Sequence, residues 1–276
     1  MNQGTSFSAS LDAGLSGATR LYFIVGDPIA QVRSPAGVTA ALRAAGRDAI
    51  VVPAHVASEN LPAFFAGASQ MKNVDGIIVT VPHKFSATEY CASLTDEAAF
   101  LGTVNTLRRL PDGRWHGGMF DGTGFVSALL DAGGKLADQR VLLIGAGGAG
   151  SAIGHALLGA GVASLDVRDN DRARTQSLVE RLNGLKRGAV SAARESDGPE
   201  TFDVIVNASP AGMRSDDPLP FDVTRLPGST FVGDVVTKPP LTPMIEAARS
   251  RGCGTVTGTQ MFGRVRDRIV EFLLEV

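Results

Sequence analysis

From Leu21 onward, short apolar runs alternate along the chain with segments of helical periodicity. The runs predict strands in the first half at 21–25, 49–53 and 76–81. The helical segments are 34–46, which Ser34 would cap, 60–68, and a stretch that ends near residue 92. Strands that alternate with helices indicate a mostly parallel sheet.

A predicted hairpin follows, in which 103–109 and 114–118 flank the turn Pro111-Asp112-Gly113. The alternation then starts again. The predicted strands of the second half are 141–144, 164–169, 202–209 and 231–236. The predicted helices are 124–133, 151–158, 171–182 and 260–276. We therefore expect an α/β fold in two halves that meet near residues 122–124.

Composition and charge narrow the class of protein. Of 276 residues, 44% are apolar and 20% charged, which is typical of a globular chain, and the net charge of −2 favours neither nucleic acid nor an acidic membrane as a partner. Residues 1–20 are small and polar and lack the pattern of a signal peptide, so we expect a flexible tail. Two cysteines without close spacing favour a cytoplasmic protein, and the four histidines show no metal-ligand spacing.

The segment 145–150 reads G-x-G-x-x-G between a predicted strand and a predicted helix. In this context Gly145 permits a tight turn, Gly147 lets the backbone approach a pyrophosphate, and Gly150 lets the helix pack closely on the strand. The amide groups at the helix start then bind the phosphates. The alternative is a tight turn without a ligand, and we favour dinucleotide binding.

The cofactor's ribose is expected at the end of the next strand, where the chain carries Arg168, Asp169 and Arg172. An acidic residue at this place binds a ribose diol, whereas arginine binds a 2′-phosphate. Both residue types are present, so the local pattern leaves NADP and NAD open.

Lys84 follows the strand 76–81 directly, in the segment VTVPHK. One interpretation is a solvated lysine in the first turn of a helix. The other is a catalytic amine at the mouth of a cleft. The residues around Lys84 do not decide between them.

Eight motifs occur together in a fixed order. They are GDPI (26–29), SP (34–35), VTVPHK (79–84), GTVNTL (102–107), DGTG (121–124), GAGGAG (145–150), NASPAGM (207–213) and DVVTKPPLTP (234–243). With this order and spacing, the chain from about residue 21 to its end resembles the shikimate dehydrogenase family. The resemblance implies a substrate-binding catalytic domain at 21–122, a Rossmann NAD(P) domain at 123–255, and a helix at 256–276 that packs back on the first domain. The cleft would lie between the two domains.

The resemblance also implies roles for single residues. Lys84 and Asp121 match the family's catalytic pair, which receives the proton of a substrate hydroxyl while a hydride passes to the nicotinamide. The positions that match substrate-binding residues are Ser34, Thr80 and Asn105, together with Val32, Thr237 and the nearby Gln260. The positions that match the cofactor site are Gly145, Ala146, Gly147, Gly148, Ala149, Gly150, Arg168, Asp169, Arg172, Asn207, Ala208, Ser209, Met213, Asp234 and Gly258. Alone, Asn105 would be a turn asparagine and Thr80 an ordinary strand residue.

The chain departs from the family where the substrate's carboxylate would lie. Val32 replaces the first serine of the S-x-S-P motif, and Thr237 replaces a tyrosine, so two of three hydroxyl donors are lost or shortened. Ile78, Phe120 and Val265 replace three further polar residues of the family pattern. A carboxylate without donors in a drier pocket is costly. Arg33 is the residue whose guanidinium could compensate.

The main hypothesis is an NAD(P)-dependent dehydrogenase, with NADP favoured over NAD, that acts on a secondary alcohol of a cyclic polyol acid or a related compound and works weakly on shikimate. One alternative is a true shikimate dehydrogenase of aromatic amino acid biosynthesis. The other is a non-catalytic NAD(P)-binding sensor of a metabolite. The expected partners are small molecules, without a metal, and the expected assembly is a monomer or homodimer.

Overall fold

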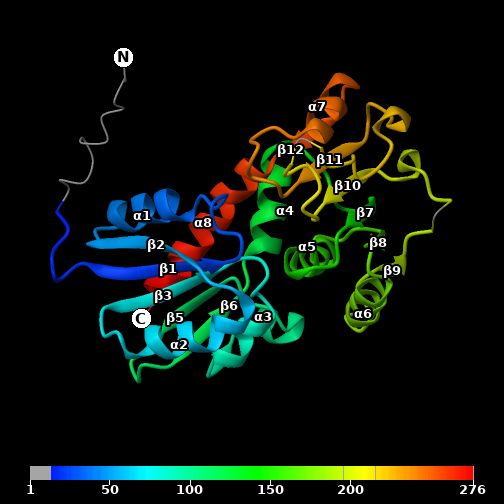
Figure 1. Cartoon of the computed structure of the whole chain (residues 1–276). Coiled ribbons are helices and arrows are strands. Elements are labelled where there is room, and N and C mark those ends of the chain that lie inside the picture. Colours follow the sequence, from blue (N-terminus) through cyan, green and yellow to red (C-terminus); the bar gives the residue numbers. More distant parts are fainter. Residues whose placement is uncertain (1–13, 195, 215, 276) are drawn as a thin grey trace, which may run out of the picture.

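The computed structural model describes residues 14–194, 196–214 and 216–275. The first 13 residues of the expected flexible tail lie outside this range. The described chain forms two six-stranded sheets with helices on their faces (Figure 1). The expected α/β class is confirmed.

The first sheet has the strand order β2-β1-β3-β5-β6-β4. Its strands are β1 (Arg20–Gly26), β2 (Ala49–His55), β3 (Val74–Val79), β4 (Ser93–Leu94), β5 (Thr106–Arg109) and β6 (Trp115–Gly118). β1 pairs with β2 and β3 in parallel, whereas β3–β5 and β5–β6 are antiparallel, so the predicted hairpin is present. The antiparallel turn brings the start of β5 to the edge where β1 and β3 end.

Side chains of β1 alternate between two cores. Tyr22 and Ile24 point into a cluster that contains residues of α1 (Ser34–Ala44), while Val25 belongs to a second cluster with α2 (Leu61–Gln70). This is the period of two that a strand with both faces covered requires. Figure 1 accordingly shows α1 and α2 on opposite sides of the sheet.

The second sheet is parallel throughout, with the order β12-β11-β10-β7-β8-β9. Its strands are β7 (Arg140–Ile144), β8 (Ser164–Arg168), β9 (Ala189–Ala192), β10 (Val204–Asn207), β11 (Phe231–Asp234) and β12 (Gly254–Val256). Its helices are α5 (Gly148–Gly159), α6 (Arg172–Asn183) and α7 (Pro243–Ser250). This order reverses direction between β7 and β10, which is where a doubly wound sheet binds its ligand.

Two helices join the sheets. α4 (Asp121–Asp131) leads from the first sheet to the second, and α8 (Gly258–Leu274) returns and packs against α4, α1 and β5 (Figure 1). One continuous apolar cluster therefore runs from the first sheet through these helices to β7. We call the part built on the first sheet the first lobe and the part built on the second sheet the second lobe.

Two local predictions are corrected. The stretch after β3 is a series of turns with a short 3-10 helix at Ser86–Tyr90, not an α-helix that extends to residue 92. The reason is tertiary: the buried ring of His83 bonds the Val56 carbonyl, and Val104 N donates to the Lys84 carbonyl, so this backbone is held by the segments that follow β2 and precede β5. Ser34 is the first residue of α1, and Arg33 occupies the N-cap position.

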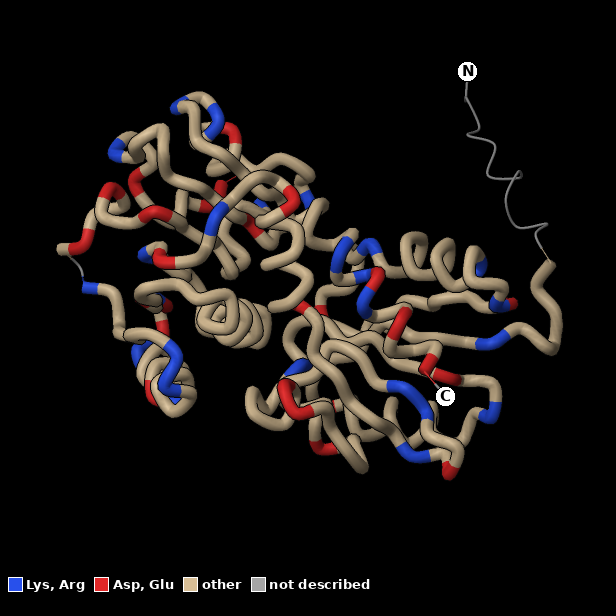
Figure 2. The backbone as a smooth tube through the Cα atoms, turned by 180° about the vertical axis from the view of Figure 1, so that it is seen from behind, with Lys and Arg blue, Asp and Glu red and all other residues tan. Residues whose placement is uncertain are grey.

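Within the described residues, no helix is long and apolar enough to cross a membrane. Figure 2 shows basic and acidic residues interspersed along both lobes, in keeping with the net charge of −2.

Candidate active site

Lys84 and Asp121 form an ion pair between the loop after β3 and the first residue of α4. Only 12% of the Lys84 side chain and 8% of the Asp121 side chain are exposed. Pairing offsets the desolvation of each charge, and removal of one partner would leave the other buried and unpaired. The N-terminus of α4 also favours the negative charge of Asp121.

Asn105 fixes the orientation of the Asp121 carboxylate. Its Nδ2 donates to Asp121 Oδ1 over 2.9 Å, and its own Oδ1 accepts from the Phe120 amide over 3.2 Å. The Phe120 amide N–H can only donate, so it must face the oxygen of the Asn105 side chain. This requirement fixes the orientation of the Asn105 side-chain amide. The structure thus brings together Lys84, Asp121 and Asn105, which lie far apart in the sequence.

The Lys84 side chain lies directly against the glycine turn of the second lobe. A Cβ built at Gly148 would be 3.1 Å from both Cβ and Cδ of Lys84. Any larger residue at position 148 would displace the lysine stem. The close contact joins the predicted catalytic amine of one lobe to the predicted cofactor turn of the other.

The glycine turn itself has the geometry that its pattern requires. Gly145 has a φ angle of +108°, a backbone conformation that residues other than glycine rarely adopt. A Cβ at Gly150 would overlap the carbonyl oxygen of Gly145, so only glycine lets α5 start so close to β7. At Gly147, by contrast, a Cβ would meet no atom within 4 Å. The amide groups at the start of α5 form a cradle that fits a pyrophosphate.

Asp169 holds this turn from the end of β8. Its Oδ2 accepts from the Ala146 amide over 2.7 Å, and its Oδ1 accepts from the Asp171 amide over 2.9 Å. Arg168 points the other way and donates to the Asp197 carbonyl over 3.3 Å. Arg172 is the exposed first residue of α6.

The segment 207–209 supports the turn from β10. A Cβ at Gly145 would lie 2.7 Å from the Ala208 carbonyl carbon, so the two backbones touch. The buried Asn207 donates to Asp234 Oδ1 over 3.1 Å and accepts from the Ser209 hydroxyl over 2.6 Å. Burial raises the pKa of Asp234 to about 6. These side chains therefore shape the loop from the protein interior.

Two other predicted cofactor positions, Met213 and Gly258, differ in their exposure. Met213 is exposed, with 37% of its surface accessible. Gly258 opens α8 against the loop after β11, and a Cβ there would overlap the Val236 carbonyl oxygen.

Where the family would bind a carboxylate, an arginine connects the lobes. Arg33 Nη2, next to the buried Ser34, donates to the backbone carbonyl of Thr237 over 3.0 Å. Val32 packs on the apolar core, and Thr80 lies beside Gly26, with its amide bonded to the Val25 carbonyl over 2.9 Å. The sequence does not predict the contact between Arg33 and Thr237, since no motif relates these two positions.

The remaining substrate positions are engaged in packing. Gln260 accepts from the Thr257 amide over 2.9 Å in a capping box at the start of α8. Val265 packs against Gly124, and Phe120 packs on Phe272 with ring centroids 5.0 Å apart. Ile78 is buried in the core. Phe120 thus forms an apolar wall where the family pattern has a polar residue.

Sequence reasoning missed Glu97. It lies on α3 (Asp96–Leu101), and its carboxyl faces His155 of α5, with 3.7 Å between Oε1 and Nδ1. An acidic residue in the first turn of a helix is ordinary, so the sequence held no signal for this contact.

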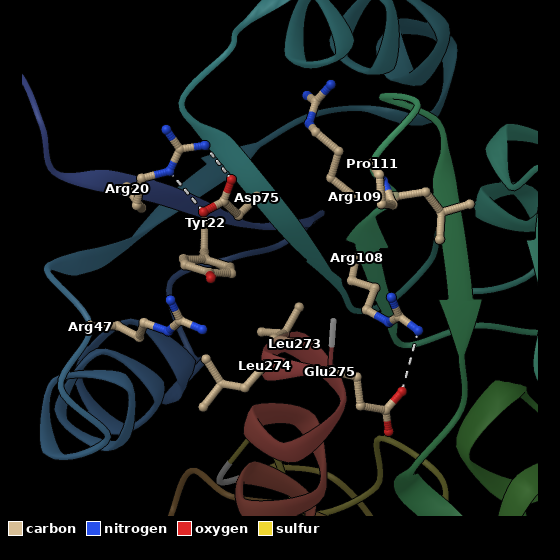
Figure 3. Close-up of a pocket in the computed structure, with 11 residues that line it drawn as sticks. Arg20, Tyr22, Arg47, Asp75, Arg108, Arg109, Pro111, Leu273, Leu274 and Glu275 are labelled. Atoms are coloured by element: carbon tan, nitrogen blue, oxygen red, sulfur yellow. Dashed lines mark hydrogen bonds and ion pairs between the residues drawn. The ribbon is translucent and has the colours of Figure 1, made fainter.

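A separate cavity of about 310 Å³ lies at the other end of the first sheet (Figure 3). It is lined near the starts of β1 and β3 by Arg20 and Asp75, which form an ion pair, whereas Lys84 follows the end of β3. Arg108 and Glu275, which also line the cavity, form an ion pair over 3.3 Å. The cavity is therefore distinct from the Lys84 site.

Comparison with known proteins agrees with this geometry. Residues 24–107 match the model of the shikimate dehydrogenase substrate binding domain, and residues 127–181 match that of the ThiF family. The chain is 35% identical over 243 residues to shikimate dehydrogenase (NADP(+)) of Lysinibacillus sphaericus, which covers 87% of each chain.

Solved structures extend the comparison. Quinate dehydrogenase from Corynebacterium glutamicum in complex with NAD is 29% identical, with a TM-score of 0.84 over 94% of each chain. The ligand-free 5-ketofructose reductase of a Gluconobacter strain is 28% identical, with a TM-score of 0.80 over 93% of each chain. Because this chain is 35% identical to a shikimate dehydrogenase over 87% of each chain, it belongs to the shikimate dehydrogenase family.

Proposed function

We propose that this protein is an NADP-dependent dehydrogenase that interconverts a secondary alcohol and a ketone. The observation that carries the proposal is the packing of Lys84, paired with Asp121, against Gly148 of the glycine turn. This contact supports the proposal, because the proposed proton-transfer group would then lie beside the turn that would hold the cofactor. In this account the second lobe, with residues 123–255, is the cofactor domain, and residues 21–122 form the substrate domain.

The glycine turn fits a dinucleotide cofactor. The amide groups at the start of α5 are suited to the pyrophosphate, and the open space at Gly147 leaves room for it. Two observations support NADP as the cofactor. The name of the Lysinibacillus relative specifies NADP(+), and Arg168 and Arg172 lie near the expected position of the 2′-phosphate. Asp169 opposes it, because a carboxylate near that phosphate repels it. When bound, the nicotinamide supplies the hydride acceptor for alcohol oxidation.

Lys84 and Asp121 act as a unit on the substrate hydroxyl. Proton transfer requires the acceptor to lie within hydrogen-bond reach of that hydroxyl. The buried ion pair of Lys84 and Asp121 acts as one unit that can accept or return one proton. Asn105 keeps the Asp121 carboxylate in place throughout. The pair therefore takes up the proton of the substrate hydroxyl while the hydride leaves the carbon atom that carries this hydroxyl.

The opposite end of the substrate meets Ser34 and Arg33, with Val32 and Thr237 in place of two family donors. Losing one hydrogen bond to a charged group costs about 1.5–3 kcal/mol. We therefore propose weak activity on shikimate, and better activity on a substrate whose group at this end is less charged or bulkier. The likeness to a 5-ketofructose reductase, whose named substrate is a neutral sugar, supports this choice.

True shikimate dehydrogenase activity is the second candidate, and the 35% identity to the Lysinibacillus enzyme favours it. Arg33 is the residue that would make it work, if its guanidinium turned from Thr237 to the substrate carboxylate. Charge-assisted hydrogen bonds of that kind are about twice as strong as neutral ones. The two candidates differ only in the substrate, not in the reaction.

A substrate panel separates the candidates. Purified protein is given NADP or NAD with shikimate, quinate and neutral cyclic or linear polyols, and nicotinamide absorbance is followed. The proposal predicts NADP reduction that is faster with a neutral polyol than with shikimate. Equal or higher kcat/KM on shikimate favours the second candidate, and absence of reduction with every polyol, in a protein that binds NADP, favours a sensor.

We further propose a cytoplasmic monomer or homodimer, since Cys91 and Cys253 are both free thiols. Light scattering of the purified protein measures its assembly.

A further inference from the structure

The cavity of the first lobe is part of the packed fold rather than of a surface loop (Figure 3). Tyr22 of β1 lies beside Gly76 of β3, which in turn lies beside Arg108 of β5. A Cβ at Gly76 would be 2.5 Å from Leu273 and 2.9 Å from Tyr22, so only glycine lets α8 lie so close to the sheet here. The volume of about 310 Å³ is sufficient for a small molecule.

Positive charge predominates among the residues that line this cavity. They include four arginines and two carboxylates, namely Arg20, Arg47, Arg108, Arg109, Asp75 and Glu275. Arg20 is paired with Asp75, and Arg109 Nε donates to the Val74 carbonyl over 2.6 Å. These two guanidinium groups are therefore occupied by the protein itself.

Arg108 is only partly satisfied by the protein. Its Nη2 lies 3.3 Å from Oε2 of Glu275, which is an exposed residue. Its Nε is buried and has no hydrogen-bond partner among the described residues. A guanidinium group can bind a carboxylate through two parallel hydrogen bonds, but Glu275 provides a single long contact. A carboxylate that is free to turn would therefore fit Arg108 better than Glu275 does.

Arg47 adds a second positive charge to the cavity. It is an exposed residue that follows α1, and in the described parts of the chain its guanidinium forms no ion pair. Figure 3 shows Arg47 and Arg108 on opposite sides of the cavity. An anion in the cavity would therefore have a positive charge on each side.

Apolar groups lie between these two arginines. Leu273 and Leu274 of α8 line the cavity together with the ring of Tyr22 (Figure 3). Burial, and secondarily the negative charge of Asp75, raises the pKa of Tyr22 to about 12. The Tyr22 hydroxyl therefore stays protonated at neutral pH and can donate to an anion. This lining suits a ligand that has an apolar body as well as an anionic group.

We propose that the cavity is a second ligand site, which binds a small organic carboxylate with an apolar body. The carboxylate takes the place of the Glu275 side chain on Arg108, and the apolar body packs on Leu273 and Leu274. Asp75 and the carbonyl end of α8 add negative charge, which disfavours a phosphate dianion. The proposal goes beyond the dehydrogenase activity and does not depend on it.

The test uses 3-phenylpropionate, which joins one carboxylate to an aromatic body. Its binding to the full chain is followed by ligand-observed NMR, with and without NADP. The matched control is 3-phenylpropanamide, which has the same shape without the charge, and inorganic phosphate supplies an anion without an apolar body. We expect 3-phenylpropionate to bind about tenfold or more tightly than either control. NADP should not compete, because the cavity is distinct from the Lys84 site.

Single substitutions locate the bound carboxylate. Arg108→Gln should weaken binding about tenfold or more, and the exposed Arg47→Gln about threefold. Glu275→Gln should strengthen binding about threefold, because it removes the carboxylate that competes for Arg108. Arg43→Gln, at an exposed position outside the cavity lining, and Arg33→Gln, at the substrate end of the candidate active site, should both match the wild type. Thermal unfolding confirms that each variant is folded.

Several results would overturn the proposal. They are no binding of 3-phenylpropionate, equal affinity for the amide, and tighter binding of phosphate. Equal affinity of the wild type, Arg47→Gln and Glu275→Gln would also overturn it, and this comparison remains valid if Arg108→Gln does not fold. Loss of binding in Arg33→Gln, with no change in the cavity variants, would place the carboxylate in the candidate active site instead.

Discussion

The Arg33 guanidinium donates a hydrogen bond of 3.0 Å to the backbone carbonyl of Thr237, and so connects the two lobes. Thr237 stands where the family pattern has a tyrosine. Where the family pattern has the hydroxyl group of that tyrosine, this chain therefore has a backbone carbonyl that is bonded to the Arg33 side chain. Whether a substrate carboxylate can bind here depends on what competes for that guanidinium.

Restoring the family's donors should restore activity on shikimate. In Val32→Ser/Thr237→Tyr, two hydroxyl groups again meet the carboxylate, and at about 1.5–3 kcal/mol each they should raise kcat/KM for shikimate by roughly a hundred- to ten-thousand-fold if the terms add. The matched measurement is kcat/KM for the best neutral polyol, which should not rise. If the wild type is already proficient on shikimate, or the double variant gains nothing, the substrate proposal is wrong.

Two neighbouring glycines should have separable roles. Gly148→Ala pushes a methyl group against the Lys84 stem, so we expect kcat to fall by roughly tenfold or more through misplacement of the amine, while NADP still binds. Gly147→Ala meets no protein atom, so its cost should appear in NADP affinity instead. The two quantities are obtained from steady-state kinetics and fluorescence titration. Identical effects of both variants would contradict the assigned contacts.

Asp169 should determine the preference between NADP and NAD. Asp169→Asn removes the negative charge near the expected 2′-phosphate yet keeps an oxygen that accepts from the Ala146 amide. Because an exposed charge interaction is worth about 1 kcal/mol, NADP affinity should rise about fivefold relative to NAD affinity. Dissociation constants for both cofactors test this. A ratio that does not change means that this carboxylate does not face the phosphate.

Asp234 should make the fold less stable as pH rises. Its pKa is raised from the ordinary 3.8 to about 6, so between these values the native protein binds more protons than the unfolded chain. The free energy of unfolding therefore falls as pH rises through this window, by about 3 kcal/mol at most. Urea unfolding of the wild type and of Asp234→Asn measures the effect. The wild type should lose stability relative to the variant from about pH 4 to about pH 7. Parallel curves would contradict the expectation.

Local sequence patterns predicted the strands and the glycine turn, because these depend on neighbouring residues. The predicted strand 21–25 lies inside β1, and Gly145 has the positive φ that its motif implies. The segment after β3 is predicted as helical because its periodicity fits a helix, but the bonds of His83 and Lys84 to the segments that follow β2 and precede β5 determine its shape.

Contacts between the lobes could not be predicted. The pairs Arg33–Thr237 and Glu97–His155 join residues whose separation depends on how two sheets are oriented, and no local pattern contains that angle. Lys84 and Asp121 were paired only because the chain resembles a family, since neither residue's surroundings in sequence identify a partner. The packing of Gly148 on Lys84 likewise became visible only in the structure.

We propose that the Lys84–Asp121 pair performs proton transfer beside a bound cofactor. The most direct measurement is kcat/KM of Lys84→Ala and Asp121→Asn on the best substrate, alongside their dissociation constants for NADP, with Lys72→Ala as an exposed control. We predict that both pair variants lose on the order of a hundred- to ten-thousand-fold in kcat/KM. Their NADP affinity should stay within a few-fold of wild type, and Lys72→Ala should be unaffected. Near-normal turnover of a folded Lys84→Ala protein would contradict the account.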